Sequence, residues 1–367
     1  MKQRLLKVGT ILMMCALVLA PAVASAAGGS FVGRFNTISN VASTVPTNGD
    51  VNPYGVAVVP NSIGALMKGD VLVSNFNNSA NSQDTGTTIV QVAPDGTTTL
   101  FAQISASNLT GPCPGGVGLT TALAVLRSGW VIVGSLLTAD GTTATAQAGC
   151  LIVLDRWGHS VETLSGHLIN GPWDMAALDE GDKAALFVAN VLNGDVAHKS
   201  GVVRKGTIVR INLDVSDGRM PRDTGRTVIG SGFGERGDPA ALIIGPTGVG
   251  LGRDGTLYVA DSLANRVAAI PNAVHRMTSA GMGHTVTMNG ALNTPLGLTI
   301  APNGDVLTTN GNDGNLVETT PGGNQIATMM IDNTGIGAGT LFGLAVAPQG
   351  HGIYFVNDGN NMLDLLH

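Results

Sequence analysis

The sequence predicts an all-β protein, a six-bladed β-propeller with four-stranded antiparallel blades, because one apolar strand pattern recurs and helical patterns are scarce. A short apolar run that ends in a polar residue occurs six times in the 367 residues. The runs end at Asn75, Ser135, Asn190, Asp261, Asn310 and Asn357. Their spacing of roughly 50 to 70 residues is that of propeller blades. Runs that are apolar on both faces belong in sheets covered on both sides, as neighbouring blades cover one another.

A second short run precedes each of these six, and we interpret it as the innermost strand of the blade. The six openings are Pro53-Tyr-Gly55, Gly116-Val-Gly118, Pro172-Trp-Asp174, Pro246-Thr-Gly248, Pro295-Leu-Gly297 and Leu341-Phe-Gly343. In the fourth unit Asp254-Gly255 separates the two runs, and this dipeptide suits a tight hairpin because it accepts positive φ. Each unit therefore begins with an inner strand, a hairpin and a second strand.

Composition agrees with this architecture. Aromatic residues make up 4% and charged residues 12% of the chain, and there are 52 glycines. Such a profile is typical of many short strands and turns. We expect residues 27–367 to form a single propeller domain. Since the last unit stops after three strands, we expect Ser30–Ile38 to join the C-terminal blade as its outermost strand and close the ring.

The first 26 residues have the pattern of a signal peptide. Lys2, Arg4 and Lys7 precede the apolar run Val8–Ala20, and Ala24-Ser-Ala26 is an A-x-A cleavage site. No other stretch approaches the roughly 18 apolar residues of a membrane-spanning helix. We therefore expect export to the periplasm or the extracellular space, with cleavage near Ala26.

The net charge of the chain disfavours two classes of binding partner. The formal net charge of −6 falls to about −9 without the basic residues of the signal peptide, which disfavours nucleic acid and anionic membranes as partners. We expect a monomer that binds a protein, a glycan or a small molecule at one face.

In an oxidising compartment Cys113 and Cys150 are predicted to form a disulfide, which would contribute about 3–4 kcal/mol by restricting the unfolded chain.

The six polar residues that end the second strands, called here the rim residues, are expected to lie at one rim of the ring. Their oxygens could converge on a polar ligand or on a hard cation. Asn and Asp also cap turns by bonding nearby backbone groups, and repetition in every blade favours this structural role.

Blade 3 departs from the repeat and supplies the candidate site. Asp174 stands where the other openings have glycine, directly after Trp173. His167 lies in the loop that enters this blade, and Asp195 and His198 lie in its long loop after the second strand. Asp and His could act as acid–base partners or as metal ligands. The alternative is that Asp174 bonds loop backbone, Trp173 packs and both histidines are solvated.

The segment LYVADSLANRV, residues 257–267, resembles a repeat of the NHL-repeat family at Asp261, Asn265 and Arg266. The Pro-x-Gly openings at 53–55, 246–248 and 295–297 also match the usual start of an NHL unit. The resemblance implies a six-bladed propeller, a scaffold that carries binding modules, lyases and lactonases alike. Related lactonases hold a divalent metal at the axis with a Glu that opens the first blade, whereas this chain has Asn52-Pro-Tyr54 there.

Two functions follow as hypotheses. The first is a binding or recognition scaffold, since the loops after the second strands are long in the first three blades, at residues 76–87, 136–148 and 191–205. The alternative is a metal-assisted lyase or lactonase-type hydrolase with its site at the top of blade 3. The sequence requires no cofactor and contains no metal-ligand signature, although a propeller axis can accommodate a divalent cation.

Overall fold

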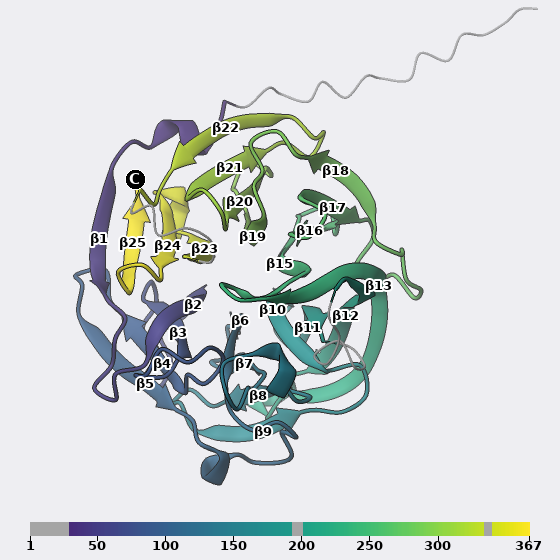
Figure 1. Ribbon diagram of the computed structural model, residues 1–367. Helices are drawn as coiled ribbons and strands as arrows, with labels where there is room; N and C mark the ends of the chain where they lie inside the picture. The colour runs from purple at the N-terminus through teal and green to yellow at the C-terminus, as the bar shows by residue number, and fades with distance from the viewer. Residues whose placement is uncertain (1–28, 193–200, 334–339) are drawn as a thin grey trace, which may run out of the picture.

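The computed structural model describes residues 29–192, 201–333 and 340–367, and it forms six antiparallel sheets arranged as blades around an axis. Figure 1 shows the ring with one strand of each blade facing the centre. The predicted six-bladed β-propeller is confirmed. The segment 1–26 predicted as a signal peptide, and with it Asp195 and His198, lie outside the described residues.

The first three blades follow one another along the chain. Blade 1 comprises β2 (Val51–Val58), β3 (Val71–Asn77), β4 (Thr88–Val92) and β5 (Thr98–Gln103). Blade 2 comprises β6 (Leu119–Val125), β7 (Val131–Ser135), β8 (Cys150–Leu154) and β9 (Ser160–Leu164). Blade 3 comprises β10 (Gly171–Asp179), β11 (Lys183–Val191), β12 (Val203–Asp214), β13 (Arg222–Asp238) and β14 (Leu242–Ile244).

The remaining blades are more regular. Blade 4 comprises β15 (Pro246–Leu251), β16 (Leu257–Asp261), β17 (Arg266–Ile270) and β18 (His284–Met288). Blade 5 comprises β19 (Pro295–Ile300), β20 (Val306–Asn310), β21 (Asn315–Thr319) and β22 (Gln325–Met330). Blade 6 comprises β23 (Leu341–Val346), β24 (Ile353–Asn357), β25 (Met362–Leu366) and β1 (Ile38–Ser43).

The second strands are buried along their whole length except for Lys183 at the start of β11, which explains their largely apolar sequences. Every residue of β3, β7, β16, β20 and β24 is buried. The core lies between blades: one cluster joins Ile132 of β7 and Leu151 of β8 to Leu186 and Val209 of blade 3. Each blade therefore serves as the cover of the next, and burial of apolar area between blades stabilises the ring.

The N-terminal strand lies further along the chain than the sequence predicts. Ile38–Ser43 pairs antiparallel with β25, whereas most of Ser30–Ile38 is not a strand. Val32–Arg34 instead forms a single 3₁₀ turn, η1, with Phe31 and Val32 buried between blades 5 and 6. The predicted bounds Ser30–Ile38 are therefore wrong, although an N-terminal strand does pair with the C-terminal blade. The apolar residues Phe31 and Val32 instead fill the space between two blades as a plug.

Glu318 of β21 anchors this plug. Its carboxylate accepts hydrogen bonds from the backbone N–H groups of Phe31 at 2.7 Å and Val32 at 2.8 Å. The hydroxyl of Ser30 donates a third bond at 2.6 Å. Burial alone would raise the pKa of Glu318, but these hydrogen bonds to its charged form outweigh burial and lower the pKa below the ordinary value.

Blade 3 also contains a strand that the repeat does not predict. The outer strand β13 is 17 residues long, and its end pairs with β14 through Arg236 and Ile244. Figure 1 shows this part of the chain sweeping from the outside of blade 3 toward the axis. The extra strand arises because the chain between β13 and β15 packs Leu242 and Ile243 into the apolar cluster near the axis.

The predicted disulfide is present and joins Cys113 in the loop before β6 to Cys150 at the start of β8. A disulfide is consistent with an exported protein. Within the described residues, the structure contains no helix that is long and apolar enough to span a membrane.

We predict that Glu318→Gln lowers the free energy of unfolding by about 1–3 kcal/mol at pH 7, because hydrogen bonds to a charged acceptor are lost. Since the folded-state pKa of Glu318 is lowered, the ionised form stabilises the protein above the ordinary glutamate value of 4.5. The stability difference should therefore shrink as the pH falls below that value. Urea unfolding at pH 7 and at pH 3.5 measures both effects.

Glu180→Gln is the matched control, since Glu180 is exposed in the turn between β10 and β11. Equal stability of the two variants at pH 7 would show that the carboxylate of Glu318 does not anchor residues 30–32.

Candidate functional site

The inner strands enclose a cavity of about 290 Å³ at the axis, which we call the axial cavity. All six blades contribute to its wall, for example through Val56, Leu123, Met175, Leu251, Ile300 and Ala345. Apart from Thr121 and Thr299, the wall side chains other than Asp174 are apolar or glycine. Asp174 is the one ionisable side chain among the described residues that line it.

The backbone of β10 turns Asp174 toward this cavity. Pro172 pairs with Asn190 and Asp174 pairs with Ala189, so Trp173 is the extra residue of a β-bulge. A bulge changes the direction of the side chains that flank it. The Oδ2 atom of Asp174 accepts a hydrogen bond of 2.8 Å from the backbone N–H of Val249 in the neighbouring blade.

Burial raises the pKa of Asp174 to about 7. Loss of hydration disfavours the carboxylate more than the bonds from the backbone N–H groups of Val249 and Met175 favour it. Only 9% of the residue is exposed. At neutral pH the carboxyl group is therefore divided between its neutral and ionised forms and can accept or release a proton.

Glycine occupies the position of Asp174 in four other blades, at Gly55, Gly248, Gly297 and Gly343. A Cβ atom added to Gly297 would lie 1.7 Å from the carbonyl oxygen of Phe342, and one added to Gly343 would lie 2.0 Å from that of Tyr54. Neighbouring inner strands thus approach too closely for a side chain. Blade 3 alone carries a carboxyl group at this position.

The inner strand of blade 2 begins later than the opening Gly116-Val-Gly118 predicts. Leu119, rather than Gly116, is the residue that pairs with the rim residue Ser135. The position that corresponds to Asp174 therefore lies between Leu119 and Leu123, at Thr121 or Ala122, and not at Gly118. The shift arises because β6 contains a longer irregularity, between Leu119 and Leu123, than the other inner strands.

Four aromatic side chains, Tyr54, Phe76, Trp173 and Phe342, form a cluster that we call the aromatic cap. Tyr54 stacks on Phe76 with ring centroids 4.3 Å apart, and Trp173 meets Phe76 edge-on at 5.7 Å and Phe342 at 6.4 Å. Blades 1, 3 and 6 supply these residues, so their contacts cross the axis. The cap closes the ring at the rim where the second strands end, and the cavity extends to Leu251 and Ile300 at the opposite ends of their strands.

Carboxyl groups that sequence reasoning missed surround the cap. Burial raises the pKa of Tyr54 above its ordinary value, with further contributions from the charges of Asp358, Asp84 and Asp238. Asp84 is fully buried, neither of its carboxyl oxygens has a hydrogen-bond partner in the described structure, and burial raises its pKa well above the ordinary value. Nothing in the sequence around Asp84 distinguishes it from the other polar loop residues.

The described residues do not fit a divalent metal. They contain no group of three His, Cys, Asp or Glu side chains that could hold a metal ion. In the axial cavity Asp174 supplies the single carboxyl group of the described wall, whereas hard cations in proteins take about six to eight oxygen ligands, several of them carboxylates.

The six rim residues are buried and bond to their surroundings. Asn190 Oδ1 accepts hydrogen bonds from the backbone N–H groups of Asn170 and Gly171 at 2.8 and 2.9 Å. Asp261 forms a buried ion pair with Arg266 at 2.9 Å. The other four also bond backbone groups: the side chains of Asn75, Ser135 and Asn310 each donate to a backbone carbonyl 19 to 31 residues earlier in the chain, and Asn357 accepts from the nearby N–H of Gly359.

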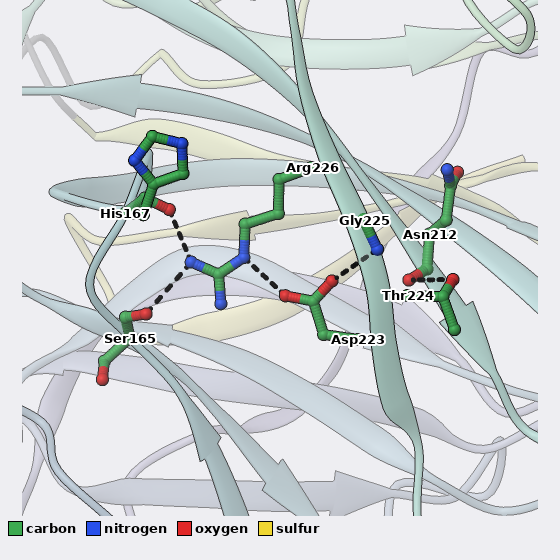
Figure 2. Close-up of polar contacts among 7 residues, drawn as sticks. All are labelled: Ser165, His167, Asn212, Asp223, Thr224, Gly225 and Arg226. Carbon is green, nitrogen blue, oxygen red and sulfur yellow. Dashed lines mark hydrogen bonds and ion pairs between the residues drawn. The ribbon is translucent and has the colours of Figure 1, made fainter.

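His167 lies on the outer side of blade 3, away from Asp174. Its backbone carbonyl accepts a hydrogen bond from Arg226 of β13, which also pairs with Asp223, while its exposed imidazole makes none of the contacts drawn in Figure 2. Since β13 is three strands from β10, the two elements are separated by roughly 14 Å across the sheet. Of the predicted blade 3 residues that the structure describes, Trp173 lies in the aromatic cap and Asp174 lines the axial cavity, whereas His167 lies in neither.

Known structures resemble this chain in fold. A gluconolactonase from Xanthomonas campestris is 12% identical, with a TM-score of 0.54 over 88% of each chain. The calcium-binding protein regucalcin from Agrobacterium tumefaciens is 14% identical, with a TM-score of 0.53 over 90% of this chain and 93% of its own. A streptogramin B lyase is 12% identical, with a TM-score of 0.50 over 90% and 97% of the two chains.

No protein-family model matches the sequence, and no curated protein does so. The chain is therefore similar in fold to six-bladed propellers of the gluconolactonase, regucalcin and streptogramin lyase type. Membership of the NHL-repeat family stays a prediction.

We predict that Asp174→Asn stabilises the protein above pH 7. Because the folded-state pKa is about 7 against the ordinary 3.8, the folded protein loses stability as the pH rises between these values. An asparagine removes this cost and still accepts the bond from Val249. The free energy of unfolding should rise by about 2–4 kcal/mol at pH 8 and change little at pH 4. Thermal and urea unfolding at the two pH values, with the exposed Asp182→Asn as control, measure this. A loss of stability at pH 8 would contradict the raised pKa.

Proposed function

We propose that this protein is a hydrolase or lyase that carries out acid–base chemistry on a small molecule in the axial cavity. The observation that carries the proposal is the carboxyl group of Asp174, which is desolvated, has a pKa of about 7 and faces a cavity of about 290 Å³. A general base works best when its pKa lies near the working pH. The fold similarity to a gluconolactonase and a lyase supports this class of function at least as well as a binding scaffold.

The reaction that we propose to test first is hydrolysis of a small lactone. Asp174 removes a proton from a water molecule as the water oxygen attacks the carbonyl carbon. The tetrahedral intermediate then collapses, the bond to the ring oxygen breaks, and the proton held by Asp174 passes to that oxygen. The product is the open hydroxy acid, and Asp174 returns to its ionised form.

The wall of the axial cavity defines the class of substrate. Its wall side chains are one carboxyl group, two threonines and apolar groups, but polar atoms make up most of the exposed wall, so the substrate is compact, uncharged and carries polar groups of its own. The aromatic cap closes one end, and we infer that the substrate enters from the rim of the turns between first and second strands. No step requires a metal, in keeping with the donor set of the described residues.

A second candidate is ligand binding without turnover, the function of a recognition scaffold. The observation that favours it is the absence of a second ionisable side chain from the described wall of the axial cavity. Asp174 would then serve as a hydrogen-bonding anchor for a hydroxyl or amino group. A protein or glycan partner would bind at the loops of blades 1 and 2 above the aromatic cap.

The cellular setting is part of the proposal. We propose that residues 1–26 are a signal peptide and that residues 27–367 form one exported NHL-type domain that acts as a monomer in the periplasm or outside the cell. The disulfide between Cys113 and Cys150 supports export.

We predict that kcat/KM for the best lactone of a small panel rises with pH through an inflection near 7, because the general base must be ionised. Asp174→Asn should lower kcat by about a hundredfold to ten-thousandfold. Proton release measured in a pH-stat follows turnover, and calorimetry follows binding of the same lactone. Asp182→Asn is the control.

The result separates the two candidates. Binding of the lactone without turnover in the unchanged protein supports the recognition scaffold. Full activity of Asp174→Asn would contradict any catalytic role for this residue.

A further inference from the structure

A groove of about 460 Å³ lies between blades 3 and 4, away from the axial cavity. Val202 and Arg204 border it from blade 3, and Leu263, Met282 and Met288 border it from blade 4. We call these five residues the inter-blade groove. The aromatic cap and Asp174 contribute nothing to its lining.

The groove is apolar where it meets solvent. Val202 is 54% exposed, Met288 49% and Met282 39%. Leu263 and Ala264 add further apolar surface from the turn between β16 and β17. Exposed apolar side chains gathered in a concave site, rather than scattered singly, mark a binding surface.

The charge at the groove is positive although the whole chain is acidic. Arg266 and Asp261 lie at the base of the groove and neutralise each other in a buried ion pair of 2.9 Å. Arg204 at the edge is exposed and forms no ion pair within the described structure, and its Nη1 atom lies 4.0 Å from Sδ of Met282. The guanidinium of Arg204 therefore stands beside an apolar trough, and it shares the electrostatic influence of Asp261 with Arg266, which leaves one positive charge in excess.

We propose that the inter-blade groove binds a free amphiphile with a linear acyl chain and a carboxylate head. The acyl chain packs along Val202, Met282 and Met288, and flexible methionine side chains adapt readily to such a chain. The carboxylate accepts hydrogen bonds from the guanidinium of Arg204, whose planar donors match carboxylate geometry. This site is independent of the proposed reaction, because it shares no residue with the axial cavity.

Titration calorimetry with dodecanoate below its micelle concentration tests the proposal, with dodecanol as the neutral control ligand. Met288→Glu and Val202→Glu should each weaken dodecanoate binding at least tenfold, because both place a negative charge in the acyl trough. Both residues are exposed, so the variants should fold. Met67→Glu is the matched control, since Met67 is 53% exposed in blade 1.

Arg204→Gln should weaken dodecanoate binding about three- to fivefold, in the range of a surface ion pair, and leave dodecanol binding unchanged. Asp174→Asn should bind dodecanoate as the unchanged protein does. The proposal is overturned if dodecanoate does not bind or if Met288→Glu binds it normally. Binding to anionic lipid vesicles without binding to monomeric dodecanoate would also overturn it, in favour of a membrane surface.

Discussion

The close approach of the inner strands around the axis is the constraint on which the rest of the structure depends. At Gly297 and Gly343 an added Cβ atom would lie within about 2 Å of a backbone oxygen in the next blade. This contact fixes how near the blades stand to one another and hence how small the axial cavity is. It also makes Asp174 distinctive, since blade 3 places a carboxyl group where four other blades tolerate only glycine. The carboxylate meets the next blade through the backbone N–H of Val249 instead.

Two features act together on Asp174. The aromatic cap closes one end of the axis, and the inner strands bury the carboxyl group. Its ionised form therefore loses hydration, and only the bonds from the backbone N–H groups of Val249 and Met175 compensate. The resulting pKa of about 7 costs stability at neutral pH. A residue that destabilises the fold while it lines the central cavity is the expected signature of a functional group. Five of the six rim residues are uncharged, and the sixth, Asp261, is buried in an ion pair with Arg266 although burial raises its pKa as well.

Much of the fold could be predicted from the sequence, because each second strand is covered on both faces and must be apolar along its length. Comparison of the six blade openings also identified Asp174, because it stands where the other predicted openings have glycine. Apart from the disulfide between Cys113 and Cys150, the side-chain contacts between distant segments could not be predicted. One such contact is the aromatic cap, which joins Tyr54, Trp173 and Phe342. Another is the set of hydrogen bonds from residues 30–32 to Glu318, because of which the N-terminal strand begins at Ile38 and spans Ile38–Ser43 rather than Ser30–Ile38. His167 was grouped with Asp174 because loop direction is invisible in sequence, and the bond from Arg226 holds it on the outer side.

The central claim is that Asp174 is a desolvated carboxyl group that exchanges its proton near neutral pH. Carbon-13 NMR of protein labelled at aspartate carboxyl carbons, compared with the spectrum of Asp174→Asn, assigns this group and follows its titration from pH 4 to pH 9. The structure predicts a midpoint of about 7 for the resonance that the substitution removes. A midpoint near the ordinary value of 3.8 would show that the carboxyl group is hydrated and would contradict its role as the acid–base group of the axial cavity.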